Sequence, residues 1–235
     1  MKRKPLYLEA LARLVLALVI SMGTLAFAQK ESVKPGINDN FQNPDLERYV
    51  NIFEGESRAI FKSRNEIVAT MKIEAGMDVA DVGAGTGFFS RMVSYQVGKE
   101  GTVYAIDIAK SFIKHIDKMA KAEGITNITA KVCNERSVEL PQDSIDLAFI
   151  CDVYHHFEYP IDSMASVHKA LRPGGRVMIV AFERVVGVSG EWTLGHVRCG
   201  KGTVTDEMAD SGFDFVKEVD LGMDDQWVRI YRKRG

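Results

Sequence analysis

The sequence has few cysteines, no surplus of either charge, and no internal repeat or low-complexity tract. Three cysteines in 235 residues, Cys133, Cys151 and Cys199, are too few and too odd in number for a disulfide framework. Thirty basic residues against 32 acidic ones form no basic patch, which disfavours nucleic acid or an anionic lipid surface as a partner. With 46% hydrophobic and 26% charged residues, the chain has an ordinary globular composition and room for one sizeable core.

The first 28 residues form a segment of their own. Three basic residues at positions 2 to 4 precede an apolar run at 14–25, and the sequence AFA at 26–28 matches an A-x-A cleavage site. We therefore expect a signal peptide that is cleaved after Ala28, and a periplasmic or secreted protein. The alternative is an uncleaved membrane anchor, although the apolar run is short for a span. Cleavage would leave a mildly acidic protein without stable membrane insertion.

A polar segment with two prolines, residues 29–45, follows and is predicted to be a linker or surface arm. From residue 46 to 71 the apolar residues recur at helical intervals, with an interruption near Gly55, which predicts two helices. These helices open the single predicted domain, which covers residues 46–235.

The centre of the chain alternates short apolar runs with segments of helical periodicity. The apolar runs are at 78–83, 102–107, 127–133, 144–152 and 175–183, and the helical segments are at 87–97, 111–124 and 162–175. Strands that alternate with helices predict a parallel sheet with helices on both faces.

The end of the chain breaks this alternation. A short helix is expected at 205–213, and two strands at 214–221 and 226–233 have no helix between them. The predicted fold is therefore α/β: a doubly wound, Rossmann-like sheet of seven strands, mostly parallel, with an antiparallel pair at the C-terminal end.

The turn after the first predicted strand, in DVGAGTG at 81–87, contains Gly83, Gly85 and Gly87. Glycine is required where the backbone takes a positive φ or approaches a ligand closely, and such a turn opens the start of the next helix to a ligand. Dinucleotide-binding folds use G-x-G-x-x-G, but Phe88 stands where their third glycine would be. The spacing therefore disfavours NAD.

With Asp81 two residues ahead, DVGAGTG resembles motif I of the class I S-adenosylmethionine-dependent methyltransferases. Asp107 ends the second strand in VYAIDI, SIDLAFICD is similar to the family's fourth strand, and LRPGGRVMIV to its junction into the fifth. The closing strand pair is also similar, so that the resemblance covers roughly residues 46 to 235. It implies S-adenosyl-L-methionine as the cofactor.

The resemblance also implies roles for residues at matching positions. Asp81 would organise the methionine amino end, and Asp152 would stand where cofactor and substrate meet. CNERSVELP departs from the family's usual form after the third strand, but Glu135 or Asn134 is the candidate for the adenine amino group. The remaining implied cofactor contacts are Gly83, Gly85 and Gly87 along the loop, and Asp107 and Ile108 at the ribose and adenine.

Candidates for the chemistry follow the fourth strand, where ligands bind in open α/β sheets. Methyl transfer is an in-line displacement that needs alignment and exclusion of water and no metal. Tyr154, His155 and His156 stand at this position, and histidine suits the role of a base. Quinone-type and small-molecule methyltransferases have a similar histidine pair, so these histidines either line the pocket or act as a base.

A glycine-rich insertion follows the fifth strand. It is expected to form a lid or part of an acceptor pocket, or else a solvated loop. His196 and Cys199 have H-x-x-C spacing, which is not a metal site by itself. His115 and His168 lie within helices and are expected at the surface or in packing. The candidate lid residues are Glu183, Arg184, Trp192, His196 and Arg198.

The leading hypothesis is an exported methyltransferase that transfers a methyl group from S-adenosylmethionine to a small-molecule acceptor. Because an exported compartment has no obvious cofactor supply, a second hypothesis is a binding protein that keeps the fold without transfer activity. A dinucleotide-dependent oxidoreductase is a third, which Phe88 and the antiparallel end disfavour.

Overall fold

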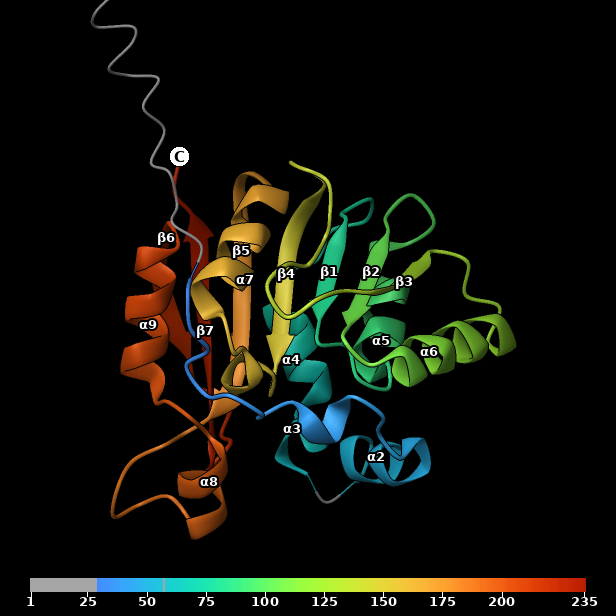
Figure 1. The fold of residues 1–235 in the computed structure, drawn as a ribbon. Helices are drawn as coiled ribbons and strands as arrows, with labels where there is room; N and C mark the ends of the chain where they lie inside the picture. Colours follow the sequence, from blue (N-terminus) through green and yellow to red (C-terminus); the bar gives the residue numbers. More distant parts are fainter. Residues whose placement is uncertain (1–28, 57) are drawn as a thin grey trace, which may run out of the picture.

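The computed structural model describes residues 29–56 and 58–235, so the predicted signal peptide lies outside the described residues. Its centre is one seven-stranded sheet in the order β3-β2-β1-β4-β5-β7-β6 (Figure 1). β7 runs antiparallel to β5 and β6, and the other neighbours are parallel, so the predicted fold class is confirmed. The strands are β1 (Val79–Val82), β2 (Val103–Asp107), β3 (Ile128–Val132), β4 (Ile145–Cys151), β5 (Leu171–Phe182), β6 (Phe213–Val219) and β7 (Gln226–Lys233).

The central strands are apolar along their length because both faces of the sheet are covered. All four residues of β1 are buried, and β4 is buried at five of seven positions. Continuous burial of this kind is typical of parallel sheets between helical layers. One face packs against α4 (Arg64–Thr70) and α5 (Phe88–Val97), and the other against α7 (Pro160–Ala170) and α9 (Lys201–Asp210).

Helix boundaries differ from the prediction in three places. The region 46–71 forms three short helices, α2 (Leu46–Phe53), α3 (Ala59–Lys62) and α4, because the backbone at Ser63 leaves the helical conformation. α7 ends at Ala170, and the residues after it already belong to β5. α9 begins four residues before the predicted start. α6 (Lys110–Ala122), which covers β2 and β3, agrees closely with the prediction.

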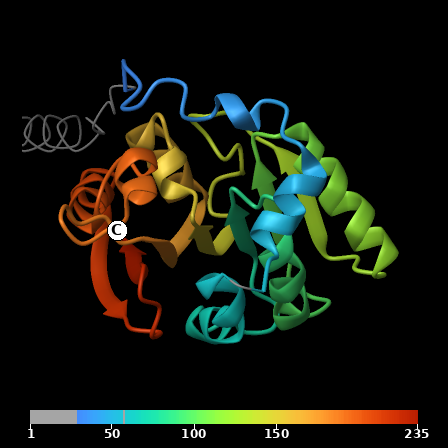
Figure 2. The ribbon, with the colours of Figure 1, turned by 90° about the horizontal axis from the view of Figure 1, so that it is seen from below.

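The segment 29–45 is an arm that lies across the domain, as Figure 2 shows in blue. The amide of Val33 donates to the carbonyl of Glu158 at 2.9 Å, and that of Gly36 to the Glu158 carboxylate at 3.1 Å. Asn38 Nδ2 donates to the carbonyl of His156 at 3.0 Å. The arm, with its short helix η1 (Asp39–Phe41), therefore forms part of the wall around the carboxyl ends of the strands. Across the described ranges, no helix combines the length and apolarity that a membrane span requires.

Candidate active site

A cavity of about 530 Å³ opens at the carboxyl ends of β1, β2 and β4. It lies where the strand order reverses, since β2 and β4 flank β1 on opposite sides. Open α/β sheets bind ligands at this point because the loops diverge there and leave a crevice. The arm, α2, the glycine loop, residues 133–138 and the segment after β4 complete the wall.

The glycine loop takes its shape from close packing against other elements. Gly83 and Gly87 have φ of +73° and +77°, a region that glycine adopts without strain. A Cβ at Gly83 would lie 2.4 Å from the Val153 side chain, and one at Gly87 would lie 2.7 Å from Ile116. Gly83 and Gly85 line the cavity as expected, whereas Gly87 does not and instead allows α6 to pack closely.

Asp81 lies at the edge of a second cavity of about 80 Å³, which shares Gly83, Gly85 and Asp152 with the first. Its side chain is 4% exposed, and Ser90 Oγ donates to Oδ2 at 2.6 Å. Burial raises the pKa of Asp81 to about 6, although the Ser90 hydroxyl group lowers it. A carboxyl group in this position can hold a cationic group of a ligand.

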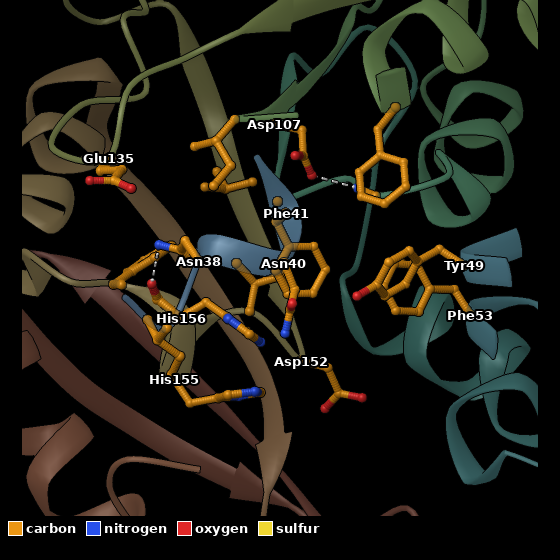
Figure 3. A pocket seen from close by; sticks show the side chains of 18 of the residues that line it. Asn38, Asn40, Phe41, Tyr49, Phe53, Asp107, Glu135, Asp152, His155 and His156 are labelled. Atoms are coloured by element: carbon orange, nitrogen blue, oxygen red, sulfur yellow. Dashed lines mark hydrogen bonds between the residues drawn. The ribbon is translucent and has the colours of Figure 1, made fainter. Parts of the chain in front are cut away.

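Asp107 connects β2 to the glycine loop. Its Oδ2 accepts from the amide of Gly85 at 2.9 Å (Figure 3). Its Oδ1 accepts from the amide of Ala109 at 2.8 Å. Burial raises the pKa of Asp107, and these amides lower it. Each carboxylate oxygen can accept a further hydrogen bond, so Asp107 can still bind hydroxyl groups from the cavity. Ile108 lines the cavity beside it.

Asp152 borders both cavities and is held by residues from two distant segments. Arg58 Nη2 is 2.6 Å from its Oδ2, and Gln226 Nε2 lies 2.9 Å from each carboxylate oxygen. Burial raises the pKa of Asp152 to about 7, and the Arg58 guanidinium opposes this rise. Its φ of +53° is one that few residues other than glycine adopt. The sequence analysis missed Arg58 and Gln226, because no local motif marks either.

The histidine pair after β4 lies in the short helix η2 (Tyr154–His156), and His155 and His156 both line the cavity, at the side opposite Tyr49 and Phe53 (Figure 3). His196, from α8 (Glu191–His196), joins them. Burial lowers the pKa of His156 to about 4 and that of His155 well below its ordinary value. A neutral imidazole with so low a pKa is a weak base near pH 7, which favours pocket lining.

Tyr154 does not join the histidines, which corrects its assignment as a catalytic candidate. Its side chain is fully buried in the core that β4, β5 and α7 form, and the cavity wall does not include it. The rings of Tyr154 and Phe157 are 5.3 Å apart, and the Arg198 guanidinium lies 5.5 Å from the Tyr154 ring centroid. The turn of η2 directs Tyr154 into the core and directs His155 and His156 toward the cavity.

Glu135 lines the cavity but lies apart from Asp107, near Asn38 of the arm (Figure 3). Burial and the nearby Glu158 raise its pKa, and a hydrogen bond with Asn38 lowers it. Asn134, the other candidate for the adenine contact, donates to Glu139 at 2.6 Å. The assignment of an adenine contact to either residue stays a prediction.

The insertion after β5 divides its five candidate residues into two groups. Trp192 and His196 line the cavity and stack on each other, with ring centroids 4.8 Å apart. The other three hold the insertion in place. Arg184 donates to the carbonyls of Val197 and Leu194, Arg198 makes a two-bond pair with Glu207, and Glu183 pairs with Lys201.

The fold and the site together define a class of Rossmann-like proteins that bind a nucleoside-containing cofactor at a glycine loop and an acidic strand end. Residues 73–211 match the model of a family described as a methyltransferase domain. The chain therefore belongs to the methyltransferase domain family, and its fold is that of the class I S-adenosylmethionine-dependent members.

Curated relatives match about half of the chain. A ubiquinone/menaquinone biosynthesis C-methyltransferase (UbiE) of Marinomonas sp. is 28% identical over 122 residues, which cover 52% of this chain and 49% of that protein. A demethylmenaquinone methyltransferase of Geobacillus kaustophilus is 26% identical over 126 residues, or 54% of this chain and 53% of that protein. The chain thus spans about half the length of the curated relatives it matches.

Solved structures agree in fold. A SAM-dependent methyltransferase from Aquifex aeolicus superposes with a TM-score of 0.71 at 19% identity, covering 81% of this chain and 99% of that one. The [4+2]-cyclase SpnF has a TM-score of 0.64 at 15% identity, covering 74% of this chain and 81% of that one.

The family identifies S-adenosyl-L-methionine as the cofactor, and the residues present fit it. Gly83 and Gly85 line the cavity, and neither carries a side chain that would narrow it. Asp81 offers a buried carboxyl group and Asp107 offers lone pairs, as an ammonium group and vicinal hydroxyl groups require.

Proposed function

We propose that this protein transfers a methyl group from S-adenosyl-L-methionine to a small, largely apolar acceptor that contains a hydroxylated aromatic ring. One observation carries the proposal: a single cavity is bordered by Gly83, Gly85 and Asp107 on one side and by the histidines and Trp192 on the other. A cavity of about 530 Å³ lies within the range of small-ligand sites, roughly 300–1,000 Å³.

The cofactor would occupy the side formed by the glycine loop. Asp81 would hold its ammonium group, Asp107 its ribose hydroxyl groups, and Ile108 would cover the adenine. When bound, the cofactor supplies an electrophilic methyl group. Asp152, which borders both cavities, would line the passage between the two ligands.

The acceptor would occupy the side lined by aromatic residues. Phe41 of the arm meets the His156 ring edge-on, with centroids 4.9 Å apart. Phe182 meets the Trp192 ring edge-on at 5.3 Å. Such rings favour an aromatic ligand through offset and edge-to-face contacts. The relatives named for ubiquinone and menaquinone biosynthesis support an aromatic acceptor of the quinone class.

The chain's own residues would act chiefly by alignment. The arm and α8 form two walls of the cavity, and a bound acceptor between them would displace water from the reacting atoms. The histidines, whose pKa values burial lowers, would shape the pocket as neutral rings. Holding an already nucleophilic acceptor in line with the methyl group supplies most of the acceleration.

The test has two arms. Titration calorimetry with S-adenosylmethionine, S-adenosylhomocysteine and NAD should show binding of the first two only. Incubation with methyl-labelled cofactor and a panel of hydroquinones should then give a labelled product in mass spectrometry. Cofactor binding without product from the panel or from a metabolite extract would contradict the proposed acceptor class and favour the binding protein without transfer activity.

A further inference from the structure

Three histidines from two segments of the chain converge on one wall of the cavity. His155 and His156 lie in η2, and His196 ends α8, forty residues further along. One ring nitrogen from each lies within 4.8 Å of those of the other two, and the Nε2 atoms of His156 and His196 are 3.3 Å apart. The H-x-x-C spacing of His196 did not reveal this cluster, because its partners are distant in sequence.

The distance between the two Nε2 atoms fits ligands of one tetrahedral ion. Zinc–imidazole bonds are about 2.0–2.1 Å long, so two such bonds at the tetrahedral angle separate their nitrogens by about 3.3–3.4 Å. The observed 3.3 Å is longer than the usual hydrogen bond, about 2.7–3.2 Å. This pair of nitrogens is therefore already spaced for shared coordination, and the other nitrogens of the cluster, up to 4.8 Å apart, would have to move closer by rotation of the rings.

The burial of the cluster points the same way. His155 is 3% exposed, and its Nδ1 atom is buried with no hydrogen-bond partner within the described part of the chain. An unpartnered buried polar atom costs about 1–3 kcal/mol. His155 lines the cavity, so coordination of an ion there would offset this cost.

The position of His196 is fixed by contacts outside the cluster. Arg184 donates to the carbonyls of Leu194 and Val197 on either side of it, at 3.1 and 2.7 Å, and the Trp192 ring stacks on its imidazole. Lys34 Nζ donates to the His196 carbonyl at 2.7 Å. The backbone of His196 is therefore held beside the other two histidines.

We propose that His155, His156 and His196 bind one divalent transition-metal ion of the zinc class and leave its fourth position open to the cavity. Three histidines with one open position form a ligand set that catalytic zinc sites use. The cluster itself contains no carboxylate, and Arg198 and Lys34 are the cationic groups that act on His155. An anionic fourth ligand would balance the charge of the ion.

The anion that fits the cavity is the hydroxyl oxygen of an aromatic acceptor, which would release its proton to solvent when it binds the metal. A bound dication lowers the pKa of an oxygen ligand and fixes its position. The assignment of an aromatic acceptor as the fourth ligand rests on the proposed function, whereas the metal site itself does not. The class of substrate would then be a phenol or hydroquinone whose oxygen binds the metal.

Titration of the chelator-treated full chain with Co²⁺ tests the metal site. Co²⁺ gives visible absorption bands whose intensity reports tetrahedral coordination, and Zn²⁺ should displace it. We expect one equivalent of Co²⁺ to bind the wild type. His196→Ala and His196→Gln should each weaken binding by about a hundredfold or more, since loss of a mere hydrogen-bond partner of a metal ligand already costs about 10–100-fold. His115→Ala, a histidine of α6 outside the cluster, is the matched control and should bind as the wild type does.

Absence of stoichiometric Co²⁺ binding by the folded wild type, or unchanged binding by both His196 variants, would overturn the site. Circular dichroism confirms that the variants fold. Azide and phenol added to the Co²⁺-loaded protein without cofactor should each shift the spectrum. An unchanged spectrum with azide would overturn the open position on the metal. An unchanged spectrum with phenol would overturn the binding of the acceptor oxygen to the metal. Binding of S-adenosylhomocysteine, the product of the cofactor, is measured by calorimetry and tests the proposed function separately.

Discussion

The carboxylate of Asp107 accepts a hydrogen bond from the amide of Gly85 at 2.9 Å, so the acidic end of β2 is bonded to the loop that follows β1. The same carboxylate bonds the amide of Ala109 at the start of α6. Asp107 therefore connects the glycine loop to the start of α6 before any ligand binds. Binding to a preordered loop costs less conformational entropy.

We expect Asp107→Ala to weaken S-adenosylmethionine binding by about 1–3 kcal/mol, roughly tenfold to a hundredfold, because charge-assisted hydrogen bonds to hydroxyl groups are lost. Titration calorimetry measures the affinity, and thermal unfolding without cofactor checks that the fold persists. Unchanged affinity would remove Asp107 from the cofactor site.

The affinity for the cofactor should depend on pH through Asp81. Its pKa is raised to about 6 by burial, so the empty protein favours the neutral carboxyl group below that pH. Its contribution to stability is therefore present below the ordinary pKa near 3.8 and is lost as the pH rises through about 6. A cationic ammonium group has the opposite preference and binds the ionised form.

Cofactor affinity should thus reach a plateau above pH 6 and fall by about tenfold for each pH unit below it. Asp81→Asn should bind more weakly and lose this dependence. Calorimetry between pH 5 and about 7.5 measures both proteins. A wild-type affinity that is constant across this range would show that Asp81 does not hold the cationic group.

The local sequence patterns determined the strands and the cofactor loop, whereas contacts between distant segments determined the rest of the site. Burial on both sheet faces produces the apolar run of β4, and the glycine spacing follows from the close approach of Val153 and Ile116. The apolar run and the spacing of the glycines can each be read within a few residues of the sequence. Such local patterns were enough to predict the order of the elements and the position of Asp107.

The pairing of Arg58 with Asp152 joins residues 94 positions apart, and Gln226 reaches the same carboxylate from the last strand. Neither partner belongs to a recognisable motif, since the pairing depends on how α3, β4 and β7 meet in three dimensions. Tyr154 was wrongly grouped with His155 for the related reason that a 3₁₀ turn sends adjacent side chains in different directions.

Gly83→Ala should destabilise the protein more than Gly76→Ala does. Both glycines have positive φ, +73° and +87°, so both substitutions incur backbone strain of about 1–2 kcal/mol. A Cβ at Gly83 also meets Val153 at 2.4 Å, whereas nothing lies within 4 Å at Gly76. The collision should add about 1–3 kcal/mol, measured by urea unfolding.

Val153→Ala provides the check on this cause. If the collision is responsible, adding Val153→Ala to Gly83→Ala should restore about 0.5–3 kcal/mol relative to the additive expectation. Strict additivity of the two substitutions would attribute the cost of Gly83→Ala to backbone strain alone.

We also expect export to leave a chain that begins at Gln29. The Gln29 nitrogen lies 2.8 Å from Asp162 Oδ1, so cleavage after Ala28 would turn this contact into a charge-assisted bond from a new amino terminus. N-terminal sequencing of the periplasmic fraction from a Gram-negative host tests this. Membrane-bound protein that retains residues 1–28 would support the anchor instead.

The ion pair between Arg58 and Asp152 should matter more at high pH than at low pH. Burial raises the pKa of Asp152 to about 7, so its contribution to stability is present below its ordinary pKa and is lost as the pH rises through about 7. Arg58 limits this loss by stabilising the carboxylate. Without Arg58 the pKa should rise further, and the buried group should become more costly to ionise.

Arg58→Gln should therefore lower the free energy of unfolding by about 1–2 kcal/mol at pH 8, a reduced share of the 3–5 kcal/mol typical of broken buried pairs because the Arg58 side chain is 25% exposed. At pH 5.5, where Asp152 is mostly protonated in both proteins, the difference should shrink toward zero, given a wild-type pKa of about 7. Urea unfolding at both pH values measures this difference.

Arg48→Gln in α2, on the same cavity wall, is the matched control and should follow the wild type. An equal loss at both pH values would mean that Arg58 stabilises the fold by packing and its bond to the Phe53 carbonyl rather than through the charge of Asp152.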